Sequence, residues 1–132
     1  MGHPNESFAR DAFAAINAAD VPWLQAHTHD DVVFHQGGHF PTAGVYEGRD
    51  ALFGHFMEFM QLVEGKFSME LHDVLANDDH AVLLVAVTIG KGGRELTFNE
   101  THVWHIRDGL AVEMWAIPVD PYAVDEFFAA VA

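Results

Sequence analysis

Two of the ten histidines stand where a side chain could transfer protons, and His102 is the better placed of them. It lies in the run 98–106, whose period-two alternation groups Glu100, His102 and Trp104 on one face and turns His105 to the other. A face that combines aromatic rings with one carboxylate and one imidazole is typical of a pocket wall. Because histidine titrates near neutral pH, we predict that His102 is a catalytic acid or base, with Glu100 to orient it. The alternative is a core histidine that satisfies a hydrogen bond.

His35 is the second candidate, because it lies in a predicted strand over 32–36 that ends directly before a glycine-rich loop over 37–44. Backbone beside glycine can approach a ligand closely, and residues that flank such loops often form sites. We therefore predict that His35 is the catalytic counterpart of His102 across one shared cavity, with Gln36 contributing hydrogen bonds to a substrate. The alternative is a strand-end histidine in contact with solvent.

Further polar side chains and a group of apolar ones complete the predicted site. Tyr46 is expected to donate a hydrogen bond to an oxyanion, although such a tyrosine more often packs against its neighbours. Asp120 stands between two prolines, and for this residue we favour a role as cap of the last helix. Catalysis by its carboxylate is the second possibility, and Asp120 stays a catalytic candidate. His55 is interpreted as half of a surface pair with Glu58. The predicted apolar wall of the substrate pocket comprises Phe34, Phe53, Phe56, Trp104 and Met114.

A metal centre is the weaker hypothesis for these histidines. The chain has no cysteine and no H-E-x-x-H pattern, so the familiar zinc arrangements are absent from the sequence. The one metal site that this sequence still allows would be built from His35, His39 and His102. Elemental analysis would test it. We expect neither a metal nor a cofactor.

The elements that must position these side chains follow from hydrophobic periodicity. Helices are predicted after Asn5, after Asp20 and over about 50–63, where an apolar stripe repeats with helical spacing. A short strand should hold Tyr46, and four longer strands are predicted over 67–76, 80–89, 95–106 and 110–117. The turns between these four carry Asn, Asp and Gly, which is typical of antiparallel hairpins. A closing helix is predicted over 121–131.

This order of elements predicts an α+β fold. Helices followed by a meander allow a strongly curved, mixed or antiparallel sheet to wrap around the three N-terminal helices. Such a cone-shaped arrangement would enclose a hydrophobic pocket. No linker or repeat interrupts the chain, so residues 1–132 are expected to form a single domain.

Composition excludes several classes of partner. A net charge of −14, from 20 acidic against 6 basic residues, repels phosphate backbones and argues against nucleic-acid binding. The sequence has no polybasic segment for anionic lipid, no run long enough to span a membrane and no secretory signal pattern, so a cytoplasmic protein is expected. The apolar runs 82–89 and 103–117 exceed what one sheet face would expose to water, which predicts a homodimer through the outer face of the sheet.

Six segments carry a resemblance to a known family: 16–21, 30–35, 43–50, 71–78, 102–109 and 120–127. From about Phe8 onward the chain resembles the nuclear transport factor 2-like superfamily, in its SnoaL-like (polyketide cyclase) and ketosteroid isomerase-like branch. The resemblance implies the cone fold with its pocket. Carried over by position, the catalytic tyrosine of ketosteroid isomerases falls on Ala12. Their base falls on Gln36 or His35, and their second acid falls near His102. The steroid isomerase triad is therefore absent, and histidines stand near positions where acids would be.

Together these observations favour a cofactor-free acid–base enzyme of isomerase, cyclase or hydrolase type. Its substrate would be a hydrophobic small molecule such as a polyketide-like carbonyl compound or an epoxide. The alternative is a non-catalytic module of the same fold that binds a hydrophobic ligand or supports assembly. The state of the pocket separates the two, because an open cavity lined by the histidines favours an enzyme.

Overall fold

In the computed structural model, which describes residues 3–130, two helices precede the first strand. Helix α1 (Pro4–Ala18) is capped by His3, two residues before the predicted cap Asn5, because the ring of His3 accepts the backbone N–H of Asn5 at 3.0 Å. Helix α2 (Val21–Ala26) starts where predicted, and the Asp20 carboxylate accepts the N–H of Trp23 at 3.2 Å. The two helices pack on each other, with the rings of Phe8 and Trp23 5.9 Å apart.

Six described strands form one sheet in the order β2-β1-β6-β5-β4-β3. Their bounds are β1 (Thr28–Gln36), β2 (Gly44–Glu47), β3 (Phe67–Ala76), β4 (His80–Lys91), β5 (Arg94–Arg107) and β6 (Leu110–Pro118). Neighbours pair antiparallel except β1 and β6, which run parallel, so the sheet is mixed. Helix α3 (Arg49–Leu62) lies between β2 and β3 in the chain, and α4 (Pro121–Ala130) follows β6; the predicted end of that last helix at 131 lies outside the described residues.

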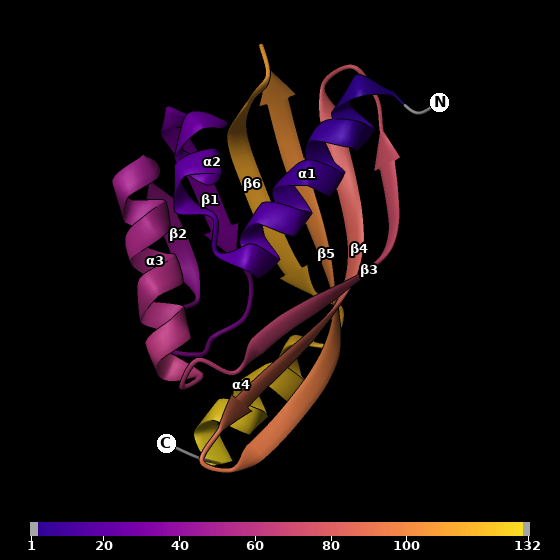
Figure 1. The fold of residues 1–132 in the computed structure, drawn as a ribbon. Coiled ribbons are helices and arrows are strands. Elements are labelled where there is room, and N and C mark those ends of the chain that lie inside the picture. Colours follow the sequence, from indigo (N-terminus) through magenta and orange to yellow (C-terminus); the bar gives the residue numbers. More distant parts are fainter. Residues whose placement is uncertain (1–2, 131–132) are drawn as a thin grey trace.

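The sheet bends strongly around the N-terminal helices, as the sequence predicts (Figure 1). Pairing shifts by one residue between Leu71 and Asp73 of β3 and between His105 and Ile106 of β5, and such bulges bend and twist the strands that carry them. Helix α1 packs against β3 and β4, whereas α3 packs against β1 and β2. The sheet stays open, with β2 and β3 at its edges. The concave space between sheet and helices is therefore bounded on several sides.

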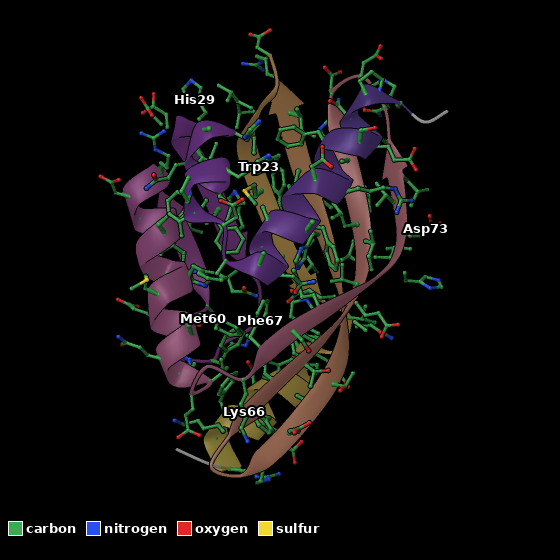
Figure 2. All side chains as sticks on the ribbon, viewed as in Figure 1. Trp23, His29, Met60, Lys66, Phe67 and Asp73 are labelled. Carbon is green, nitrogen blue, oxygen red and sulfur yellow. The ribbon has the colours of Figure 1, made fainter. Side chains whose placement is uncertain are left out.

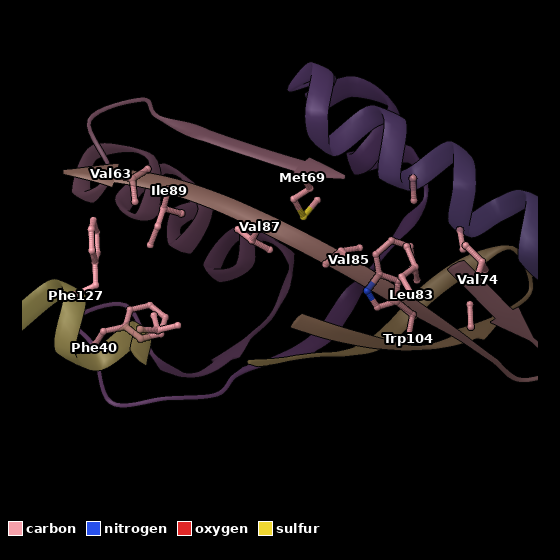
Figure 3. Close-up of a cluster of buried hydrophobic side chains, with 14 of the residues drawn as sticks. Phe40, Val63, Met69, Val74, Leu83, Val85, Val87, Ile89, Trp104 and Phe127 are labelled. Carbon is pink, nitrogen blue, oxygen red and sulfur yellow. The ribbon is translucent and has the colours of Figure 1, made fainter. Parts of the chain in front are cut away.

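The concave face of the sheet forms the core. Along β4 every second residue, from Ala81 to Ile89, is buried, and Trp104 of the neighbouring strand is 2% exposed. Figure 3 shows this row of side chains running from Trp104 to Ile89, with Phe40 and Phe127 gathered at the far end. Figure 2 shows Phe67 where α3 meets the sheet, and its ring packs edge-on against Phe59 at 5.7 Å. The core continues directly into the wall of a pocket.

Candidate functional site

An apolar pocket with a volume of about 130 Å³ lies between the helices and the concave face of the sheet. Apolar side chains, many of them aromatic, make most of its wall, and the described polar side chains that line it are few: Thr28, Gln36, His55, Glu100 and His102. A volume of this size is close to that of an apolar cavity that holds one benzene ring. The predicted wall residues Phe34, Phe53, Phe56, Trp104 and Met114 all line it. That they contact a substrate stays a prediction.

The polar centre of the pocket is the pair formed by Glu100 and His102. Nε2 of His102 lies 2.7 Å from Oε1 of Glu100, and the two side chains are 12% and 9% exposed. The strand places both on one face because they are two residues apart, and the pairing of β4 with β5 runs without a register shift from Arg94 to His105. In the pairing of a carboxylate with a neutral imidazole, the carboxylate can only accept, so the imidazole carries its proton on Nε2. Nδ1 then carries the lone pair that a general base needs.

His35 does not lie in this pocket, and the prediction that it shares a cavity with His102 is wrong. Its Nε2 lies 2.7 Å from Oε2 of Glu113, and its ring stacks on Trp115 with centroids 5.1 Å apart. The parallel register explains this position: Phe34 opposes Met114 of the pocket wall, so His35 must point to the outer face. His105 also points away from His102, as predicted, and stacks on His80 with centroids 4.9 Å apart.

Tyr46 and Asp120 are both engaged outside the pocket. The hydroxyl of Tyr46 donates to the backbone carbonyl of Thr42 at 2.8 Å, so it is not presented to a substrate oxyanion. Burial, with a smaller contribution from the Glu58 charge, raises the pKa of Tyr46. The Asp120 carboxylate accepts the backbone N–H of Ala123 at 3.2 Å and caps α4. These backbone contacts give both side chains structural roles, in place of the substrate-binding role predicted for Tyr46 and the catalytic role predicted for Asp120.

His55 is a pocket residue that the sequence reasoning misplaced on the surface. It is 7% exposed, and its ring centroid lies 4.9 Å from that of Phe34 and 4.5 Å from that of Tyr46. No described group forms a hydrogen bond with its buried Nε2. Burial lowers its pKa to about 4, against weaker opposing effects of the Thr42 backbone and the Glu100 charge, so the ring is neutral at pH 7. Its helical spacing from Leu52 and Phe59, three and four residues away on the apolar stripe, was the available signal.

Other classes of site find little support in the part of the chain that the structure covers. Between residues 3 and 130, no three or more histidine, aspartate or glutamate side chains are arranged to hold a metal ion. No helix in the same range is both long and apolar enough to cross a membrane. The pocket with its Glu100–His102 pair is therefore the candidate site.

Comparison with known families places this geometry in a wider group. A family model described as the SnoaL-like domain matches residues 9–114, which include helices α2 and α3, most of the pocket lining and both members of the polar pair. A search of curated proteins gave no match.

Solved structures match nearly the whole chain. Bal32a, from a soil-derived mobile gene cassette, shares 28% sequence identity over 94% of this chain and 95% of its own, with a TM-score of 0.88. TerC, co-crystallised with polyporic acid, shares 19% identity over 96% and 99%, with a TM-score of 0.85. IdmH from Streptomyces antibioticus, a candidate polyketide cyclase, shares 16% over 98% and 100%, with a TM-score of 0.76. At such low identity the last two likenesses establish the fold alone.

Proposed function

The chain belongs to the family of SnoaL-like domains, and from this premise we propose that it is a cofactor-free acid–base enzyme. Its substrate would be a hydrophobic small molecule, such as a polyketide-like carbonyl compound or an epoxide. One observation carries the proposal: the Glu100–His102 pair, with 2.7 Å between Nε2 and Oε1, lies in a pocket that is otherwise mostly apolar. The fold by itself would not suffice, because one fold hosts many functions.

The pair supplies the parts of a proton-transfer site. With its Nε2 proton held by Glu100, His102 presents Nδ1 as the base that removes a proton from a carbon beside a carbonyl or from a hydroxyl or water nucleophile. The imidazolium that forms stays paired with the carboxylate, which stabilises its charge. His102 then returns the proton to the product oxygen or carbon, so the enzyme ends in its starting state. Isomerisation, intramolecular cyclisation and water addition all use this sequence.

The apolar wall strengthens the same chemistry. Phe34, Trp104 and Met114 surround the polar pair with groups that exclude water, and charge interactions are stronger where water is excluded. A carbonyl substrate would therefore develop negative charge in a medium where the imidazolium acts on it with little screening. Two of the matched structures are consistent with an aromatic or polyketide-like ligand, since TerC was co-crystallised with polyporic acid and IdmH is a candidate polyketide cyclase.

The test compares activity and stability in variants of one strand. A panel of aromatic ketones, polyketide-like carbonyl compounds and epoxides first identifies a substrate of the wild type. His102→Ala should then lower kcat by roughly 10²–10⁴-fold, since one positioned proton-transfer group contributes about that much. His105→Ala is the matched control, because it removes a histidine from the opposite face of the same strand and should leave kcat unchanged.

Stability separates the proposal from the core-histidine alternative. Removing a histidine that only satisfies a buried hydrogen bond should lower the free energy of unfolding by about 1–3 kcal/mol and leave kcat intact. Full turnover in His102→Ala, on whatever substrate the wild type accepts, would reject His102 as the acid–base group. A wild type that binds compounds of the panel but turns none of them over would favour the binding module. The Tm of each variant, followed by circular dichroism, is measured beside its kinetics.

We also propose that two copies associate through the outer face of the sheet. Trp115 is stacked on His35 there, and Ile117 at the end of the same strand is 47% exposed. A second copy of this face would cover apolar side chains that water otherwise contacts. Static light scattering at micromolar concentration should give twice the chain mass of 14.6 kDa, and a monomer mass would count against the interface.

A further inference from the structure

Three residues form one row across the concave face of the sheet, and one of them is His102 of the polar pair. Gln36 of β1 opposes Ala116 of β6, and Ala116 in turn opposes His102 of β5. All three line the pocket. Strands lie about 4.8 Å apart, so the Cα atoms of Gln36 and His102 are roughly 10 Å from each other across the row. The small Ala116 side chain lies between two longer ones, which leaves room above it for a ligand.

Local hydrogen bonds fix the orientation of the Gln36 amide. Its Nε2 donates to the backbone carbonyl of Gly37 at 3.2 Å and, at the long distance of 3.5 Å, lies near the carbonyl of Ala116. Both neighbours are acceptors, so the NH₂ group must face them and the amide cannot be turned over without losing these contacts. Among residues 3–130 no group donates to its Oε1, and this oxygen is not among the fully buried unpaired atoms. The free polar atom of Gln36 is therefore an accessible acceptor.

We propose that Gln36 and Ala116 form a specificity subsite that selects ring compounds bearing a hydroxyl or another hydrogen-bond donor. The ring lies over Ala116, its donor bonds to Oε1 of Gln36, and its opposite edge faces His102. The proposal rests on the proposed function, because it assumes that the pocket binds the substrate. It adds the chemical class: a phenol- or enol-type hydroxyl, held one ring width from the carbon or oxygen that exchanges a proton with His102.

Three probes of nearly equal shape test the subsite without a known substrate. Phenol can donate a hydrogen bond, anisole carries the oxygen without its proton, and benzene has neither. Their dissociation constants are measured by isothermal calorimetry or equilibrium dialysis with the full chain. Phenol should bind roughly tenfold more tightly than the other two, since a buried hydrogen bond contributes about that factor.

Two variants assign the preference to Gln36. Gln36→Leu replaces the amide with an apolar side chain that is one bond shorter and has no acceptor, so it should bind all three probes with equal affinity. His35→Ala is the matched control, because it changes the neighbouring residue on the outer face and should keep the tenfold preference. NMR of the wild type gives a measurement that does not depend on a variant folding: phenol should shift the side-chain amide signals of Gln36 further than anisole and benzene do.

The experiments distinguish a failure of the subsite from a failure of the acid–base proposal. Equal binding of the three probes to the wild type, or a preference that survives in Gln36→Leu, would overturn the subsite and leave the acid–base proposal standing. If none of the probes binds the wild type, the pocket does not accept aromatic rings and the subsite is overturned, while the kinetics of His102→Ala still decide the acid–base proposal.

Discussion

The buried ring of His55 gives a prediction about the pH dependence of stability. Its pKa is lowered to about 4 from an ordinary value of 6.5, mainly because burial disfavours the charged ring. The unfolded chain therefore binds a proton more readily than the folded one between these two values. The stability that the neutral His55 contributes is fully present above pH 6.5 and is lost as the pH falls toward 4.

The size of the effect follows from the shift. A difference of about 2.5 units corresponds to about 3 kcal/mol when the loss is complete, because one unit is worth about 1.4 kcal/mol. At pH 5.5, where a free imidazole is mostly charged and His55 is still neutral, the linkage amounts to about 1.4 kcal/mol. For a domain of this length that corresponds to a Tm difference of about 5 °C.

Urea unfolding at pH 7.5 and pH 5.5 measures this term by difference. His55→Phe keeps an aromatic ring in the pocket and removes the titrating group, so it should lose about 1.4 kcal/mol less than the wild type between the two pH values. His72→Gln is the control, because His72 is exposed and its replacement should leave the pH dependence of the wild type unchanged. Identical pH dependence in wild type and His55→Phe would show that His55 titrates normally and that its burial has been misjudged.

Two further substitutions test the corrected roles, and a third tests the packing of the core. Tyr46→Phe removes the hydrogen bond to the Thr42 carbonyl and should lower the free energy of unfolding by about 1 kcal/mol without changing kcat; a large fall in kcat would restore Tyr46 to the site. Asp120→Ala removes the α4 cap and should destabilise by about 1 kcal/mol with activity retained, whereas lost activity at unchanged Tm would indicate catalysis. Leu83→Ala, at a fully buried position of β4, should cost about 2–5 kcal/mol in urea unfolding, and a cost below 1 kcal/mol would contradict the packing described for that strand.

Local sequence signals were sufficient where the structure depends on near neighbours. Strand β3 has its predicted bounds, because turn residues flank it on both sides. Alternation alone brought Glu100 and His102 together, since no register shift interrupts that part of β5. The Asp20 cap of α2 was likewise readable from the sequence, as a carboxylate three residues before an N–H that needs a partner.

Sequence reasoning failed where distant segments decide the outcome. Alternation separates His35 from Gln36, but the choice of which one faces the pocket is made by pairing with β6, about 80 residues later. His55 was misread because an ionisable side chain three residues before Glu58 suggested a surface pair. Its actual neighbours, Phe34 and Tyr46, come from other elements and are not visible in the local sequence. Tyr46 was misread because the hydrogen bond from its hydroxyl goes to the backbone carbonyl of Thr42, which lies in an irregular loop that no sequence pattern predicts.

The parallel pairing of β1 with β6 has a consequence for the order in which the protein assembles. Phe34 meets Met114 only when the chain has closed a loop of about 80 residues, and such long-range closure slows folding. On the ribosome, β1 emerges well before its partner and presents an unpaired edge while it waits. Gln36 and His102 face each other only after β6 has inserted between their strands. The pocket is therefore completed late in folding, and species with β6 undocked are where aggregation or chaperone contact should concentrate.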